Sequence, residues 1–233
     1  MRAVTALPAD SARFAESVLD LPPGSARVIY NGMPVPSAFA PLAPPSEPDA
    51  LRIGAVGRLA EQKGLPTLIE AMRSLPHCRL TLVGDGPDRP ALEALVRRFS
   101  LDDRVEFAGW AAPPWTATWA FDVLAMPSIN EGFPLVIVEA MLASIPVVAS
   151  TVGGIPEIVV PESTGLLVPP GDPDALAQAL RRLADDPQLR RDMGARCRAV
   201  AMGQFTDTAM AAQFEALYRE VLAARPRPGS AAE

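Results

Sequence analysis

The segment NEGFPLVIVE, residues 130–139, places two carboxylates eight positions apart in a stretch that is otherwise apolar. Glu131 precedes Gly-Phe-Pro, whereas Glu139 follows three branched aliphatic residues of the kind that fill protein cores. A carboxylate accepts two hydrogen bonds at once, so it suits neighbouring hydroxyl groups on a ligand. We expect a helix to begin at Gly132 and Pro134, with free backbone N–H groups facing the ligand beside Glu131. In the alternative interpretation, Glu131 caps this helix and Glu139 lies on its solvent face.

Two cations, Arg58 and Lys63, lie in the segment GAVGRLAEQKG. Arg58 follows the end of an apolar run at Gly57, and Lys63 comes just before a helical period that starts near Leu65. A guanidinium group binds phosphate bidentately, an ammonium group acts as a point charge, and a helix N-terminus adds its dipole. The pair therefore suits a diphosphate. Two ordinary charges on a solvated loop are the alternative.

A third loop, VGDGPDRP, contains two glycines and two acids. Gly84 and Gly86 permit close backbone approach, but Asp85 and Asp88 would repel phosphate. No GK[ST] follows, and GAVGRL lacks the GxGxxG pattern of dinucleotide sites. Taken alone, this segment indicates a structural turn.

The elements that position these loops alternate from residue 51 onward. Short apolar runs predict strands at LRIGAV, RLTLV, RVEFAG, VLAMPS and PVVAS. Helical periods predict helices at LPTLIEAMRSL, residues 92–99, PPWTATWAF and LVIVEAMLA. Such alternation predicts an α/β fold, a doubly wound parallel sheet with helices on both faces. The three loops would then meet at the carboxyl ends of the strands, where open sheets bind ligands.

A helical tail follows TGLLVPP. DPDALAQALRRLADD has Asp172 as its expected N-cap, with Pro173 at the first helical position. PQLRRDMGARCRAVA and DTAMAAQFEALYREVLAA are the other two predicted helices.

The first fifty residues differ in composition from the rest. DSARFAESVLDL predicts one helix and ARVIYNG one strand, which is too little to build a core. We therefore interpret residues 1–32 as the remnant of another domain, followed by a Pro-rich linker over 33–50. The expected division continues with a main domain over 51–204, a C-terminal helix over 205–224 and a disordered tail over 225–233.

Composition excludes several functional classes. The 233 residues carry a net charge of −6 without Lys/Arg blocks, which argues against nucleic-acid binding. No apolar run is long enough for a transmembrane segment, and the N-terminus does not resemble a signal peptide. Cys78 and Cys197 lie far apart, which indicates neither a metal site nor a disulfide. A cytoplasmic location is the expectation.

The order of seven motifs resembles the carboxyl-terminal half of the retaining family 4 glycosyltransferases, from about Arg27 to Tyr218. The motifs are NG, GRLAEQKG, VGDGP, RVEFAGW, PSINEGFPLVIVEAM, PVVASTVGGIPEIV and TGLLVPPGDPDALAQAL. This family has the GT-B fold, two facing Rossmann-like domains with the nucleotide-sugar donor in the second and the acceptor in the first. The resemblance implies that residues 51–204 bind a nucleotide-diphosphate sugar and that no metal is needed. A non-enzymatic binding subunit and a nucleotide-sugar hydrolase or epimerase are the alternatives.

The resemblance also implies roles for individual residues. Arg58 and Lys63 would clamp the donor diphosphate, Glu131 would touch the transferred sugar, and Glu139 would hold the ribose hydroxyls. The first three would be catalytic, with front-side attack and a proton passing to the leaving phosphate. The further donor contacts that it implies are Gly57, Val83, Gly84, Phe107, Gly109, Gly132, Phe133, Pro134 and Leu135.

Two departures from the family matter. Ser144 stands where glycine is common, at the expected end of the LVIVEAMLA helix, and we expect it in the left-handed conformation. We expect the first domain to be largely absent from these residues, so a separate acceptor domain or chain is an expected partner, which would also carry any peripheral membrane association. Outside the motif loops, we expect a surface role for His77, packing roles for Trp115 and Trp119, and a helix-capping role for Glu157.

Overall fold

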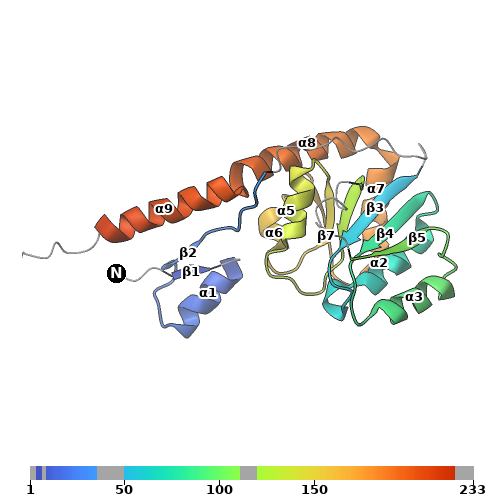
Figure 1. Ribbon diagram of the computed structural model, residues 1–233, viewed down its shortest axis with the longest axis horizontal. Helices are drawn as coiled ribbons and strands as arrows, with labels where there is room; N and C mark the ends of the chain where they lie inside the picture. Colours follow the sequence, from blue (N-terminus) through green and yellow to red (C-terminus); the bar gives the residue numbers. More distant parts are fainter. Residues whose placement is uncertain (1–3, 7–8, 36–49, 111–119, 224–233) are drawn as a thin grey trace, which may run out of the picture.

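A six-stranded parallel sheet forms the main domain of the computed structural model, which describes residues 4–6, 9–35, 50–110 and 120–223 (Figure 1). The strands are β3 (Leu51–Val56), β4 (Cys78–Val83), β5 (Val105–Gly109), β6 (Val123–Met126), β7 (Val147–Ser150) and β8 (Gly165–Val168). Their order is β5-β4-β3-β6-β7-β8, and every neighbouring pair is parallel. The direction of winding reverses between β3 and β6, the switch point at which such sheets bind ligands. The predicted doubly wound α/β fold is confirmed.

Helices cover both faces of this sheet. On one face lie α2 (Leu65–Ala71), α3 (Arg89–Arg98) and α7 (Pro173–Asp185), and on the other lie α5 (Leu135–Leu142) and α6 (Ile155–Ile158). Helix α8 (Pro187–Gln204) contributes Met193 to the first core and Cys197 to the second. Along β6, Val123 and Ala125 pack with the first group, whereas Leu124 and Met126 pack with the second. Since both faces of the strand are buried, its sequence is apolar throughout.

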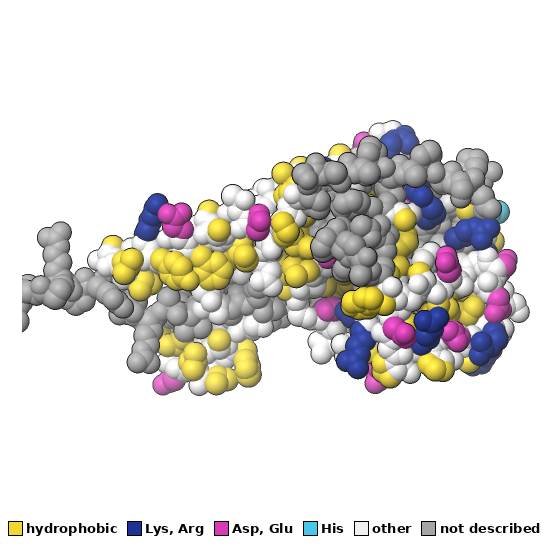
Figure 2. All heavy atoms as spheres, viewed as in Figure 1, with side chains coloured by type: hydrophobic (Ala, Val, Ile, Leu, Met, Phe, Trp, Pro, Cys, Tyr) yellow, Lys and Arg dark blue, Asp and Glu magenta, His cyan; other side chains and the backbone are white. Residues whose placement is uncertain are grey.

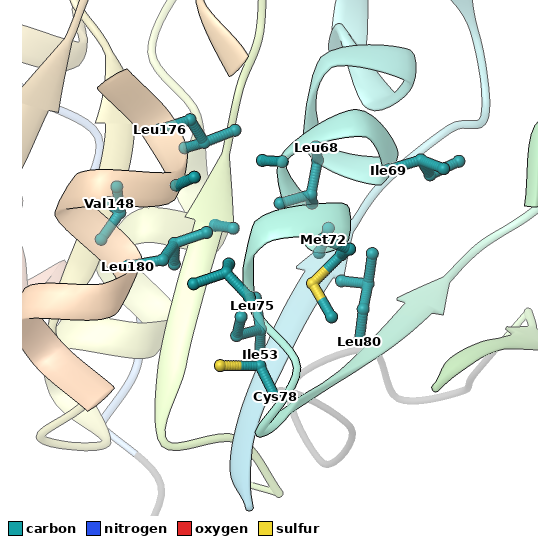
Figure 3. Packing of buried hydrophobic residues seen from close by; sticks show 14 of the residues in the cluster. Ile53, Leu68, Ile69, Met72, Leu75, Cys78, Leu80, Val148, Leu176 and Leu180 are labelled. Carbon is teal, nitrogen blue, oxygen red and sulfur yellow. The ribbon is translucent and has the colours of Figure 1, made fainter. Parts of the chain in front are cut away.

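Each face of the sheet has its own hydrophobic core. The core on the α2 side joins α2 and α7 across β3 and β7. Figure 3 shows Leu68 of α2 and Met72, which directly follows α2, with Leu176 and Leu180 of α7 above Ile53. Leu68, Met72, Leu176 and Leu180 have no solvent exposure. Asp172 caps α7 as predicted, since its carboxylate accepts a hydrogen bond from the backbone N–H of Ala175 at 2.9 Å.

A small βαβ unit stands beside the main domain (Figure 1). It consists of β1 (Val4–Ala6), α1 (Ala9–Val18) and β2 (Ala26–Val28), with β1 and β2 paired in parallel. The sequence predicted one helix and one strand here, so β1 is an addition. The C-terminal helix α9 (Asp207–Ala223) runs from the main domain toward this unit, and Arg27 pairs with Glu220 at 2.9 Å.

Several sequence predictions fall outside the described residues. They are most of the Pro-rich linker, most of the PPWTATWAF helix with Trp115 and Trp119, and the C-terminal tail. The domain boundaries remain a prediction. Within the described ranges, no helix combines the length and apolar character that crossing a membrane requires.

Candidate functional site

A small pocket opens at the switch point, between the ends of β3 and β6. It is lined by Ala55, Val56, Gly57, Arg58, Leu59, Lys63, Leu65, Ala125, Met126, Pro127 and Ser128. Arg58 and Lys63 therefore share one pocket, as a diphosphate site requires. The Arg58 side chain is exposed and forms no ion pair within the part of the chain that the structure describes.

The ends of β3, β4 and β5 are locked together through their backbones. The Gly57 N–H donates to the Val83 carbonyl at 2.9 Å, and the Gly84 N–H donates to the Gly109 carbonyl at 2.7 Å. A Cβ on Gly84 would lie 1.9 Å from the Gly57 oxygen, so only glycine permits this approach. The structure thus places these predicted donor contacts side by side.

Phe107 contributes differently from its neighbours on β5. Its ring packs partly buried against the core, with the Arg89 guanidinium 5.8 Å from the ring centre. Because the Phe107 side chain packs toward α3, only the backbone of Phe107 can contact a ligand at the edge of the sheet.

The position of Lys63 is set by a short 3-10 helix, Glu61–Lys63, and by the glycine after it. Gly64 has a φ of 60°, and a Cβ there would lie 2.0 Å from the Pro127 carbonyl oxygen. The Ile129 N–H also donates to the Gln62 carbonyl at 2.9 Å. The loop after β3 is therefore fixed against the loop after β6.

Glu131 forms an ion pair with Lys63 through Oε1 and Nζ. The same carboxylate oxygen accepts a hydrogen bond from the Ser128 hydroxyl at 3.0 Å. The Lys63 and Glu131 side chains are only 20% and 12% exposed, so the ammonium group is held in place before any ligand binds. Ser128 was not predicted, although it directly follows the β6 strand at the switch point.

The alternative in which Glu131 caps α5 is wrong. The N-cap of that helix is Pro134, no side chain caps it, and the helix begins at Leu135, later than predicted. Glu131 lies instead in the preceding loop. The Ile137 N–H donates to the Pro134 carbonyl at 3.1 Å, so the uncapped first turn leaves the N–H groups of Leu135 and Val136 for a ligand at the carboxyl edge of the sheet.

The loop over residues 131–134 is held from the β7 side by two glycines. The Gly154 N–H donates to the Gly132 carbonyl at 2.9 Å. A Cβ on Gly153, whose φ is 52°, would lie 1.7 Å from the Glu131 carbonyl oxygen. Phe133 stacks against Tyr30, with ring centres 5.5 Å apart.

Glu139 lies in the middle of α5, roughly 6 Å along the axis from Leu135. Burial raises the pKa of its carboxyl group to about 7. Its carboxyl group has no hydrogen-bond or ion-pair partner among the residues placed by the structure. It does not line the pocket of Arg58 and Lys63, so the structure brings three of the four predicted charged residues into direct proximity. The interpretation of Glu139 as an exposed helix residue is wrong.

The predicted capping role of Glu157 is also wrong. Gly154 is the N-cap of α6, and the Glu157 carboxylate accepts a hydrogen bond from the Tyr30 hydroxyl at 3.1 Å. Ser144 does adopt the predicted left-handed conformation, with a φ of 62°. Cys78 and Cys197 are buried free thiols, and burial raises their pKa values to about 11 and about 12.

Known proteins share this sequence pattern. Residues 50–186 match the family model described as "Glycosyl transferases group 1". Alpha-D-kanosaminyltransferase of Streptomyces kanamyceticus is 33% identical over 71% of this chain and 45% of its own length. The lipopolysaccharide core biosynthesis glycosyltransferase LpsD of Rhizobium meliloti is 35% identical over 82% of this chain and 55% of its own length. The chain thus spans about half the length of these curated relatives.

Solved structures agree with this match. Sucrose-phosphate synthase from Thermosynechococcus elongatus superposes with a TM-score of 0.81 at 33% identity, covering 96% of this chain and 59% of that one. HepE of Anabaena in complex with UDP gives a TM-score of 0.84 at 27% identity, covering 94% and 64%. The sheet corresponds to a Rossmann-like domain of the GT-B fold. The chain belongs to the group 1 glycosyltransferase family.

Proposed function

We propose that this chain is the donor-binding half of a retaining family 4 glycosyltransferase, which transfers a sugar from a nucleotide-diphosphate sugar to an acceptor. One observation carries the proposal. Arg58 and Lys63 line one pocket at the switch point of the sheet, and Lys63 is in contact with Glu131. These groups supply positive charge and hydroxyl-binding oxygen at the edge where open parallel sheets hold ligands.

The donor would lie along the carboxyl edge of the sheet. In the proposal, its diphosphate meets Arg58, Lys63 and the N-terminus of α5, where side-chain charge and helix dipole act together. Glu131 meets the sugar, and Glu139 accepts hydrogen bonds from the ribose hydroxyls. The base lies near Val83 and Gly84. It also meets the backbone of residues 107–109.

The reaction breaks the bond between the anomeric carbon and a diphosphate oxygen, and the electron pair leaves with that oxygen. The acceptor hydroxyl oxygen forms the new bond on the same face of the sugar, so the anomeric configuration is retained. The acceptor proton passes to the leaving phosphate oxygen. Arg58, Lys63 and the α5 N–H groups stabilise the growing negative charge, a preorganised electrostatic role. We expect nucleotide binding to persist in the presence of EDTA, since these groups supply the positive charge that attracts the diphosphate.

Relatives of the chain support a nucleotide-sugar ligand. HepE of Anabaena has been solved with UDP and with UDP-glucose. The identity to HepE is 28% in the UDP-glucose complex, with a TM-score of 0.81. UDP is therefore the first nucleotide to test, and GDP and ADP are the necessary comparisons.

An acceptor-binding partner would pack on the βαβ unit. Phe14 and Val18 on α1 are 70% and 64% exposed, and Tyr218 and Leu222 on α9 are both 62% exposed. Figure 2 shows hydrophobic side chains along α9 and over this unit. A two-stranded sheet with such exposed apolar groups is marginally stable alone, which favours further structure covering it. We propose that an acceptor domain, in the same or a separate chain, supplies that cover.

A thermal-shift screen tests the donor proposal. UDP, GDP, ADP and their glucose conjugates would each be added to the chain. A ligand at 100 times its dissociation constant stabilises the folded state by about 2.7 kcal/mol. We expect at least one of the six to raise the unfolding temperature, and Arg58→Ala to reduce that shift. A folded sample that none of the six stabilises would contradict the proposal.

A further inference from the structure

We infer that Tyr30 is a positioning residue that fixes the sugar-side loop, residues 131–134, from the N-terminal segment of the chain. Tyr30 follows β2 and lies outside the sheet that carries the proposed donor site. It nevertheless contacts that site's loop on one side and α6 on the other. Its consequence for sugar binding rests on the proposed function, whereas its effect on the loop does not.

The Tyr30 ring belongs to a three-membered aromatic cluster. It stacks on Phe133, with ring centres 5.5 Å apart and planes inclined by 24°. Phe205, which is fully buried, meets Tyr30 edge-on at 5.6 Å and Phe133 at 5.8 Å. Phe133 therefore contacts both a ring from the N-terminal segment and a ring from the end of α8. It stands one residue after Gly132 and two after Glu131, so its placement constrains both.

The Tyr30 hydroxyl group extends the same connection to α6. It donates a hydrogen bond to Glu157 Oε2 at 3.1 Å. Burial and the negative charge of Glu157 raise the pKa of Tyr30, so the phenol stays protonated and remains a donor. Gly153 and Gly154, just before α6, hold the backbone of Glu131 and Gly132. Tyr30 thus contacts Phe133 of the loop through its ring and α6, which follows the two supporting glycines, through its hydroxyl group.

The backbone after Tyr30 is anchored elsewhere. A Cβ on Gly32 would lie 2.0 Å from the Thr206 carbonyl oxygen. The Met33 N–H donates to the Phe205 carbonyl, and the Asp207 N–H donates to the Met33 carbonyl, both at 2.9 Å. This clamp joins the segment to the junction of α8 and α9, and not to the sheet. A displacement of the N-terminal segment would therefore move Phe133, and with it the loop that carries Glu131.

This arrangement predicts that substitutions of Tyr30 mainly affect how the chain binds the sugar group of the donor. The aromatic cluster contacts the loop of Glu131, whereas Arg58 lies across the pocket on the β3 side. Disturbing Tyr30 should therefore weaken binding of a nucleotide-sugar more than binding of the matching nucleoside diphosphate.

The first test needs no ligand. Hydrogen–deuterium exchange would be measured over residues 128–136 in the unaltered chain and in Tyr30→Ala, Tyr30→Phe and Val96→Ala. We expect Tyr30→Ala to speed exchange in this loop by about 10-fold, because its ring contacts are lost. Tyr30→Phe keeps the ring and should restore most of the protection. Val96→Ala is the control, because Val96 is buried in α3 on the other face of the sheet and a cavity there leaves the loop unchanged.

The second test compares dissociation constants for UDP and UDP-glucose, GDP and GDP-glucose, and ADP and ADP-glucose. We expect Tyr30→Ala to weaken the nucleotide-sugar about 10-fold more than the matching diphosphate, and Tyr30→Phe by less than about 3-fold. Equal weakening of both ligands, or unchanged loop exchange in Tyr30→Ala, would overturn the inference. If the unaltered chain binds none of the six, the proposed function fails, and the exchange measurement still decides the role of Tyr30.

Discussion

Glu139 is a partly buried carboxylate on a helix whose other residues mostly face the core. Burial disfavours its charged form, which raises its pKa to about 7 from an ordinary value of 4.5. Such a group costs stability unless a ligand replaces the lost water. The hydroxyl groups of a ribose would do so, since they donate hydrogen bonds to the charged carboxylate.

Glu139→Gln tests this cost through its dependence on pH. Because the folded pKa is raised, the folded chain holds this proton more tightly than the unfolded chain does. The resulting stabilisation is complete below pH 4.5 and is lost as the pH rises through about 7. Glutamine has no proton to lose. We therefore expect the stability of the variant relative to the unaltered chain to be higher at pH 8 than at pH 5, in chemical unfolding without ligand.

At pH 8, the same substitution should favour folding of the ligand-free chain but weaken the binding of a nucleoside. An amide is a weaker acceptor than a carboxylate, so Glu139→Gln should weaken nucleoside binding by about 10-fold at pH 8. A stability difference that is the same at both pH values, with nucleoside affinity unchanged, would contradict this account of Glu139.

The residue types of the site were predictable, but their contacts were not. Arg58 and Lys63 stood out as cations at a loop between strand and helix. The ion pair of Lys63 with Glu131 spans 68 positions and has no local signal in the sequence. Ser128 was missed for the same reason, because its role depends on where Glu131 lies.

At the scale of elements, Gly64 is the contact point between the loops after β3 and β6. Gly64→Ala would force a left-handed residue and a clash with the Pro127 carbonyl oxygen. We expect it to lower the free energy of unfolding by about 2 kcal/mol or more, and to weaken nucleotide binding because Lys63 precedes it directly. Chemical denaturation and calorimetry would measure the two effects.

Gly203→Ala is the matched control for this substitution. Gly203 lies in α8, and a Cβ there meets nothing within 4 Å. Alanine favours a helix over glycine by up to about 1 kcal/mol, so this variant should be neutral or slightly more stable. If Gly64→Ala and Gly203→Ala change the free energy of unfolding equally, then Gly64 is not required for the close approach of the two loops.

Ser144 is a position at which a substitution is expected to raise the free energy of unfolding. It is exposed after α5, with a φ of 62° that glycine adopts more readily. Ser144→Gly should raise the free energy of unfolding by about 0.5–1 kcal/mol, because the strain exceeds the entropy cost of glycine in the unfolded chain. Ser144→Ala should give no such gain. Urea titrations of the three proteins would decide, and a loss of stability in the glycine variant would speak against the strain.

Most elements followed from the sequence because both faces of the sheet are buried. Continuous apolar runs marked β3, β4, β6 and β7, and helical periods marked α2, α3, α5 and the tail. β1 was missed because it has only three residues, and β8 because its Gly-Leu-Leu-Val lies between turn residues. The start of α5 was predicted too early, because glycine and proline mark the approach to a helix as well as its first turn.

At the scale of the whole molecule, the βαβ unit and α9 leave a hydrophobic surface exposed. The double substitution Phe14→Lys and Val18→Glu should reduce self-association without changing nucleotide affinity, since neither residue is near the pocket. Light scattering over a range of concentrations would measure this. Met202→Lys, at a position 43% exposed on α8, is the control and should have a smaller effect. Undiminished association in the double variant would argue that this surface does not attract other chains.

The Arg27 and Glu220 pair adds little to the attachment of this unit, because both side chains are more than half exposed. The partly buried aromatic cluster and the backbone clamp at Met33 are the stronger connections. No local pattern predicted them, because Tyr30 and Phe133 are far apart in the sequence.

The most direct measurement of the central claim is calorimetry of a nucleoside diphosphate and of its parent nucleoside against four proteins. These are the unaltered chain, Arg58→Ala, Lys63→Ala and, as a control, Arg97→Ala on the exposed side of α3. The account predicts that Arg58→Ala and Lys63→Ala each weaken diphosphate binding by about 10-fold or more, with nucleoside binding and the Arg97→Ala control unchanged. Diphosphate affinity that is unchanged in both Arg58→Ala and Lys63→Ala would contradict it.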